Sequence, residues 1–185
     1  MSEQWLQPLN AQSFRCWWPG DDAPYQHYHD TEWGRPVRND QKLFEKLCLE
    51  GFQAGLSWLT ILRKRENFRK AFSNFHIDVV ASYSEKHVNA LMQDVGIVRH
   101  RGKIEAVINN ARVMLEKNLS LEELISKHSP TVDRRGLTVS PESTALSKEL
   151  RKLGFNFVGP TTMHAMMQAI GVINDHDENC FISGR

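Results

Sequence analysis

The chain is short of cysteine, of long apolar runs and of net charge, and each shortage excludes a class of protein. Three cysteines in 185 residues are too few for a disulfide framework, so we expect reduced thiols and a cytoplasmic location. No apolar run approaches the roughly 20 residues that a membrane-spanning helix needs, and the first residues lack the basic-then-apolar pattern of a secretion signal. Because the net charge is only +1, contact with a polyanion would depend on local basic clusters.

The pattern of apolar residues predicts an all-α fold. Strand signals are scarce, whereas apolar side chains recur at helical spacing and are preceded by capping residues. We expect residues 1–15 to form a flexible N-terminal tail and residues 16–185 to form a single helical domain, present as a monomer because no long apolar stripe is left unassigned. The expected helices cover residues 39–50, 56–72, 77–82, 84–94, 101–116, 119–127, 144–152 and 160–171, with a loop over 128–143.

Two pairs of potential metal ligands stand near opposite ends of the chain. Cys16 and His29 are thirteen residues apart, and His176 and Cys180 are four apart, a spacing that places two side chains on one helix face. Zn²⁺ prefers Cys and His ligands, and a closed site with four protein ligands is structural rather than catalytic. If the two pairs meet, one zinc ion joins the ends of the chain. The alternative is a buried thiol with unrelated surface histidines.

Residues 153–159 predict a tight turn between two helices. Gly154 and Gly159 permit positive φ angles, and the N-terminus of the helix that follows offers unpaired backbone amides to an anion. This pattern is typical of the helix-hairpin-helix motif, which grips the DNA backbone without reading its sequence. An ordinary αα-hairpin with a glycine cap remains the alternative. A second loop, residues 96–103, adds three cations, Arg99, Arg101 and Lys103.

Glu50 is an unusual carboxylate, because it follows an apolar helix face and precedes Gly51. If the N-terminal loop folds onto the helices, aromatic rings surround this one carboxylate. Such a cage suits a flat cationic ring, to which cation–π attraction adds about 0.5–2 kcal/mol. The alternative is that these aromatic side chains simply form core. Those of the N-terminal loop are Trp18, Tyr25, Tyr28 and Trp33.

These segments together resemble the DNA-3-methyladenine glycosylase I family of bacteria. The resemblance covers Cys16 to Cys180 and rests on YHDTEWG at 28–34, LEGFQAGLSWLTIL at 49–62, GIVRHRGKI at 96–104, GFNFVGPTT at 154–162 and NDH at 174–176. It implies a helix-hairpin-helix glycosylase fold. It also implies a monofunctional enzyme that flips N3-methyladenine out of double-stranded alkylated DNA and releases it as the free base, leaving an abasic site.

The resemblance also implies roles for individual residues. Glu50 falls on the catalytic carboxylate of the base pocket, and we expect it to stay ionised. Gly55 and Leu56 fall on the residues that wedge into DNA where the damaged nucleotide leaves the stack. The ligands of one structural zinc ion fall on Cys16, His29, His176 and Cys180. The base-binding aromatic residues fall on Trp18, Tyr25, Tyr28, Trp33 and Trp58. The hairpin and the basic loop complete the expected DNA-binding set with Arg99, Arg101, Lys103, Gly154, Val158, Gly159, Thr161 and Thr162.

The chain departs from the wider glycosylase superfamily in two respects. Most members place an essential aspartate soon after the second helix of the hairpin, where Asp175 and Asp177 flank His176 here. Because the intervening chain is shorter, we expect Asp175 to orient His176 rather than to act in catalysis. The lysine that bifunctional relatives use for lyase chemistry is absent, and Thr161 and Thr162 stand at its place.

Two other functions remain open. A non-catalytic helix-hairpin-helix module would also bind DNA, but it would not need Glu50 or the aromatic set. A glycosylase for another alkylated purine, such as N3-methylguanine, would keep the chemistry, with Phe52 beside Glu50 altering the shape of the pocket.

Overall fold

The computed structural model describes residues 14–183, and this part of the chain is helical without a β-strand. The only bridge within it joins Phe14 to Cys180. The prediction of an all-α fold is therefore confirmed. The helical elements are α1 (Ala23–Thr31), α2 (Asp40–Gln53), α3 (Trp58–Ala71), η1 (Ser73–Phe75), α4 (Ile77–Ala81), α5 (Glu85–Leu91), α6 (Arg101–Glu116), α7 (Leu121–Ser126), α8 (Pro141–Leu153) and α9 (Pro160–Ala169).

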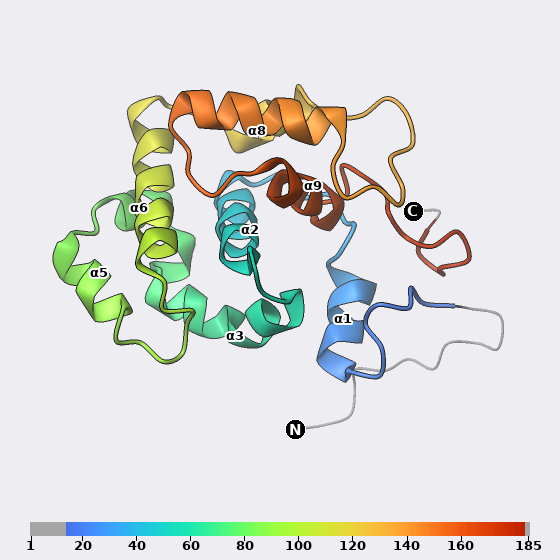
Figure 1. Ribbon diagram of the computed structural model, residues 1–185, viewed down its shortest axis with the longest axis horizontal. Coiled ribbons are helices and arrows are strands. Elements are labelled where there is room, and N and C mark those ends of the chain that lie inside the picture. Colours follow the sequence, from blue (N-terminus) through green and yellow to red (C-terminus); the bar gives the residue numbers. More distant parts are fainter. Residues whose placement is uncertain (1–13, 184–185) are drawn as a thin grey trace.

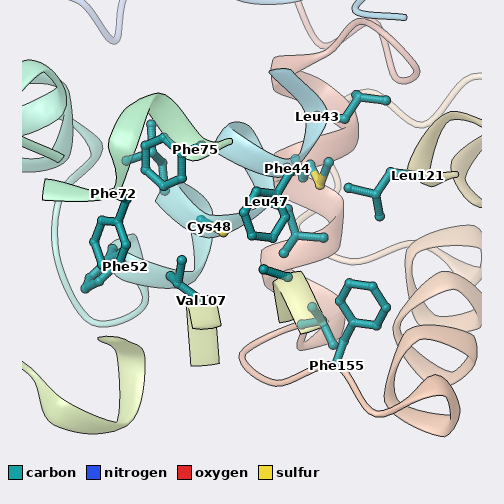
Figure 2. Close-up of a cluster of buried hydrophobic side chains, with 14 of the residues drawn as sticks. Leu43, Phe44, Leu47, Cys48, Phe52, Phe72, Phe75, Val107, Leu121 and Phe155 are labelled. Carbon is teal, nitrogen blue, oxygen red and sulfur yellow. The ribbon is translucent and has the colours of Figure 1, made fainter. Parts of the chain in front are cut away.

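Helix α2 is the centre of the fold, since it contacts α3, α6, α7 and α9 (Figure 1). Asn39 caps it by accepting a hydrogen bond from the Lys42 amide, and the apolar side chains at helical spacing then face inward. Phe44 packs against Phe75 with ring centroids 6.4 Å apart, inside the cluster shown in Figure 2. This packing fixes the direction in which the C-terminal end of α2 presents its polar residues.

Helix α2 continues past its expected end at residue 50 and stops at Gln53. Gly51 in this last turn lies next to the hairpin, since a Cβ at that position would lie 3.4 Å from Cβ of Phe157, an ordinary van der Waals distance. Glu50 therefore lies in the last turn of α2.

Helices α8 and α9 form the predicted hairpin, but its turn differs in detail from the expectation. Gly154 ends α8 with φ of 107°, as predicted, whereas Gly159 has φ of −64° and caps α9. Phe157 takes the left-handed conformation instead, with φ of 57°. The amide side chain of Asn110 on α6 holds the turn, exchanging hydrogen bonds with the backbone of Asn156 at 2.8 and 3.0 Å.

The N-terminal segment that was expected to be a loop contains helix α1. Asp22 caps it by accepting a hydrogen bond from the Tyr25 amide, and Pro24 occupies its first turn. The helical spacing places Tyr25, Tyr28 and His29 on adjoining positions of one face.

The two ends of the described chain lie against each other (Figure 1). The amide of Phe181 donates to the carbonyl of Phe14 at 2.8 Å, so the expected tail of residues 1–15 does not extend to residues 14 and 15; residues 1–13 lie outside the described residues. His176 and Cys180 lie in a series of turns, and the expectation that they share a helix face is wrong. Within residues 14–183, no helix is long and apolar enough to cross a membrane.

Gly171, just after α9, lies very close to Gly34, just after α1. It has φ of 73°, and a Cβ there would lie 2.5 Å from the carbonyl oxygen of Gly34. Gly136 has the same φ of 73° with nothing within 4 Å, so its substitution carries only the conformational cost of about 1–2 kcal/mol. We expect Gly171→Ala to lower the free energy of unfolding in urea by at least about 2 kcal/mol more than Gly136→Ala. Equal losses would show that the contact yields without cost.

Candidate active site and metal cluster

A cavity of about 610 Å³ lies beside the C-terminal end of α2, with walls from α1, α9 and the C-terminal segment. All five predicted aromatic residues and Glu50 line it. The ring centroid of Trp18 is 4.8 Å from that of Tyr25 and 5.1 Å from that of Trp33, and Tyr28 and Trp58 are 5.3 Å apart. The expected arrangement of rings around one carboxyl group is therefore present.

The rest of the lining was not anticipated from the sequence. Gln53 follows Glu50 by three positions on α2, a spacing that a longer predicted helix would have placed on the same side. The other lining residues lie in irregular segments or in α9. In those segments, the spacing of apolar residues does not predict which side chains line a cavity. These other lining residues are Trp17, Arg135, Gly136, Ala165, Gln168, Asp175, Asp177 and Glu178.

Glu50 is a buried acidic residue that lines the cavity. Its exposed fraction is 4%, and burial raises its pKa to about 8, while the charge of Lys46 lowers it in part. Burial therefore opposes the ionised form expected for Glu50, and its ionisation stays a prediction. A cation in the cavity would favour the carboxylate and lower this pKa.

The charges around the cavity are mainly acidic. Asp175, Asp177 and Glu178 share the lining with one guanidinium, that of Arg135, so the field favours a cationic occupant.

Asp175 is hydrogen-bonded to residues that line the cavity, and not to His176, the candidate metal ligand beside it. Its carboxylate accepts hydrogen bonds from the Gly136 amide at 2.6 Å and from Nε2 of Gln168 at 2.7 Å. The expectation that Asp175 orients His176 is therefore not met. The His176 ring instead faces the cysteine sulfurs, with Nδ1 3.6 Å from Sγ of Cys16 and 3.8 Å from Sγ of Cys180.

The four predicted metal ligands form one buried cluster in which the ligand atoms all lie within 4.8 Å of one another. Sγ of Cys16 is 3.6 Å from Nδ1 of His176, and Sγ of Cys180 is 3.6 Å from Nε2 of His29 and 3.8 Å from Nδ1 of His176. A tetrahedral zinc ion, with bonds of about 2.3 Å to sulfur and about 2.0 Å to nitrogen, separates such atoms by about 3.6 Å. The cluster therefore fits a metal ion of this kind.

Neighbouring groups orient these ligands. Asp30 Oδ1 lies 2.8 Å from Nδ1 of His29 and also receives the guanidinium of Arg15 at 2.8 Å, which leaves Nε2 of His29 facing the cluster. The backbone amide of Asp177 donates to Sγ of Cys16 at 3.3 Å. Carboxylate and amide partners of this sort commonly fix the ligands of metal sites.

The wedge residues project from the surface beside the cavity. Gly55 has φ of 82° with open space around it, and Leu56 leaves 42% of its surface exposed. Arg99 is exposed. The guanidinium of Arg101 is also exposed, but it already pairs with Glu85 at 2.7 Å.

Three sequence-based assignments need correction because the side chains point inward. Lys103 is 7% exposed, and its ammonium donates to the carbonyls of Phe52 and Ala54 at 2.9 and 2.6 Å, so it is not available to a phosphate. Val158 is 1% exposed within the core. The Phe52 ring lies 4.5 Å from that of Phe68 and does not line the cavity.

The three segments expected to contact DNA nevertheless lie together. Phe157 in the hairpin is 6.1 Å from the ring of His100, the cap of α6, and it also touches Gly51, as described above. Lys103 links α6 to residues 52–54. Residues 53–57, 96–103 and 154–159 therefore form one surface next to the mouth of the cavity, and Gly154, Gly159, Thr161 and Thr162 all retain some exposure there.

The fold is that of a class of DNA glycosylases of known structure. The chain superposes on a crystal structure of 3-methyladenine DNA glycosylase I with a TM-score of 0.87, at 43% identity over 91% of this chain and 99% of that one. A structure of the Staphylococcus aureus glycosylase, described as showing 3-methyladenine recognition, gives a TM-score of 0.85 at 34% identity, over 92% of this chain and 96% of that one.

The methyladenine glycosylase family model matches residues 18–183. Two curated relatives are DNA-3-methyladenine glycosylase 1 of Escherichia coli K12, 48% identical over 90% of this chain and 95% of its own length, and the DNA-3-methyladenine glycosylase of Haemophilus influenzae, 44% identical over 90% and 96%. The chain belongs to the methyladenine glycosylase family, whose members are hydrolases acting on N-glycosyl bonds.

The raised pKa of Glu50 predicts a pH-dependent stability. The ordinary pKa is 4.5 and the folded value about 8, so between these pH values the folded protein binds a proton that the unfolded chain has lost, and stability falls as pH rises. Gln cannot ionise. Glu50→Gln should therefore raise the free energy of unfolding little near pH 4.5 and by roughly 2–4 kcal/mol at pH 8.

Denaturation in urea at the two pH values measures this difference, with Glu116→Gln, an exposed carboxyl on α6, as the control. A gain from Glu50→Gln that is the same at both pH values would contradict the burial of this carboxyl.

Proposed function

We propose that this protein is a monofunctional DNA glycosylase that flips N3-methyladenine out of alkylated double-stranded DNA and hydrolyses its glycosidic bond, leaving an abasic site. The observation that carries the proposal is the position of Glu50, a buried acidic residue, in the lining of a cavity walled by aromatic rings. Ligand sites in proteins are typically cavities lined by aromatic and apolar side chains with a few polar groups that fix the orientation of the ligand. The cavity and the carboxyl of Glu50 therefore support a ligand-binding role.

The chemistry of the lesion matches this cavity. Methylation at N3 makes adenine cationic within the nucleotide, which weakens the glycosidic bond and makes the base a good leaving group. The rings of Tyr28 and Trp58 offer stacking faces and cation–π attraction, and Glu50 accepts hydrogen bonds from the polar edge of the purine. Neutral adenine can stack and donate hydrogen bonds, but it lacks the cation–π attraction and the charge attraction to a carboxylate. Excision then requires extrusion of the nucleotide, stacking of the base and stabilisation of the positive charge that develops on the sugar.

The surface formed by residues 53–57, 96–103 and 154–159 is proposed to bind the DNA. The helix-hairpin-helix formed by α8 and α9 directs the N-terminus of α9 at a phosphate, with Thr161 and Thr162 in its first turn. Leu56 is proposed to fill the gap that the flipped nucleotide leaves. Lys103 serves this surface indirectly, since it holds the backbone from which the Gly55–Leu56 wedge projects.

We propose that the Cys/His cluster holds one structural zinc ion. The supporting observations are the donor set, the separations near 3.6 Å and the closed, four-ligand arrangement. When bound, zinc supplies a covalent-strength link between the ends of the chain. Ring nitrogens of His29 and His176 and the thiolates of Cys16 and Cys180 hold it, and no step of the excision passes through it.

Excision assays on alkylated duplex DNA test the main proposal. Free 3-methyladenine should appear in excess of spontaneous release, and identification of every released base defines the range of purines, including N3-methylguanine. Glu50→Gln should slow single-turnover excision by roughly 10²-fold while binding to abasic duplex changes little. If no free base appears, the protein is a DNA-binding module and not a glycosylase; equal losses of excision and binding would reduce Glu50 to a structural role.

Metal analysis tests the cluster. The purified protein should contain one zinc ion per chain, Cys180→Ala should contain none, and Cys48→Ala, a buried thiol outside the cluster, should retain it. Chelation of the metal should lower the midpoint of thermal unfolding. The rate of excision should fall only to the extent that the metal-free protein unfolds. Loss of excision on chelation with an unchanged thermal midpoint would exclude a purely structural metal.

A further inference from the structure

Lys46 on α2 is a buried ammonium group with no hydrogen-bond acceptor in the described part of the chain. Its side chain is 13% exposed. Nζ lies 4.9 Å from the ring centroid of Tyr28 and 5.9 Å from that of Trp58, yet Lys46 does not line the cavity. The ammonium therefore sits behind the aromatic wall against which the base is proposed to stack.

The acidic neighbour of Lys46 pairs with it only at a distance. Nζ is 4.0 Å from Oε2 of Glu32, beyond hydrogen-bond reach, and both oxygens of Glu32 accept hydrogen bonds from the guanidinium of Arg65, at 2.6 and 2.8 Å. Burying an ammonium is costly unless it interacts with charge. Glu32 has the largest favourable effect of any charge on the Lys46 ammonium, and a second carboxylate partner adds to it.

Glu50 provides that partner. It follows Lys46 by four positions on α2, which places the two side chains on one helix face. The other groups facing Glu50 are Tyr25 and Tyr28 on α1 and, across the cavity, Arg135, Asp175, His176, Asp177 and Glu178. Of these, the carboxylates oppose ionisation of Glu50, and the guanidinium of Arg135 pairs outward with Asp133 at 2.9 Å. Lys46 is the charge that favours the ionised form of Glu50.

We propose that Lys46 is a positioning residue for excision: its ammonium, held behind Tyr28 and Trp58, stabilises the carboxylate form of Glu50 that receives the cationic base. The inference rests on the proposed function and deepens it. Lys46 touches neither base nor DNA and acts only through the proton on the Glu50 carboxyl. Because the ionised carboxyl is the competent form, activity depends on pH, and Lys46 sets the pH at which it appears.

The direction of the effect follows from charge. Ionisation of Glu50 should give kcat/KM an acid limb, with activity rising as the pH passes the pKa of the free enzyme. Lys46→Met keeps the length of the side chain and removes the cation. The acid limb should move upward by about one pH unit, which lowers excision at pH 7 roughly tenfold and leaves the plateau at high pH unchanged. Raising the pH should thus rescue the variant.

The experiment measures excision of 3-methyladenine from methylated duplex DNA between pH 6 and pH 10, with spontaneous release subtracted. Lys42→Met is the matched control, since it removes the same charge from an exposed position one turn earlier on α2 and should leave the limb in place. Thermal midpoints establish that Lys46→Met is folded, and it should be no less stable than the parent because an apolar group replaces a buried charge.

The outcomes separate the two proposals. A limb that is absent from the parent, or that survives in Glu50→Gln, overturns the role of Glu50 itself. A limb that is present in the parent, lost in Glu50→Gln and unmoved in Lys46→Met overturns the role of Lys46 alone. A loss in Lys46→Met that is equal at every pH also overturns it, because it would show that the residue supports the wall mechanically. An upward shift with recovery at high pH supports it.

Discussion

The cavity depends on the meeting of the two ends of the chain at the Cys/His cluster. Helix α1 carries Tyr25 and Tyr28, but it is not among the helices that pack closely on α2 or its neighbours in the described chain. Two ion pairs from α3 hold it on one side, Arg63 to Asp22 and Arg65 to Glu32, each at 2.6 Å. Such pairs contribute little by themselves. His29, in the last turn of α1, meets Cys180 and His176 on the other side. The cluster therefore joins α1 to the C-terminal segment and adds to the packing of Tyr28 in the main core.

Selectivity for a charged base can arise from the cost of burying Glu50. Burial of Glu50 opposes the charged form of its carboxyl. A neutral purine offers nothing that compensates for ionisation, whereas a cation does. In the proposed complex, binding of the cationic base and loss of the Glu50 proton are therefore linked, and each favours the other. The same burial that lowers stability between about pH 4.5 and pH 8 would then allow one carboxyl to distinguish bases of nearly identical shape.

Sequence patterns found most helices but not the directions of individual side chains. Residues 101–116 were predicted and observed with the same bounds, since a long apolar stripe and clear breakers define that helix. Helix α1 was missed because aromatic and polar residues alternate along it without such a stripe. Lys103 and Phe52 were assigned to DNA and to the pocket from their neighbours in sequence, yet both point inward. The raised pKa of Glu50 was also beyond prediction, because it depends on burial, which only the packed structure reveals.

The C-terminal end of α2 connects recognition of the base with contact to DNA. Its last carbonyls carry the negative end of the helix dipole, a potential that opposes ionisation of Glu50 one turn earlier. Lys103 binds the carbonyls of Phe52 and Ala54, so a residue that resembles a phosphate ligand in sequence instead neutralises this end of the helix. Gly55 and Leu56 follow directly. In the proposed complex with DNA, a displacement of Gly55 and Leu56 would be transmitted through the same few peptide groups that orient Glu50, and Lys103 is the side chain that holds those groups in place.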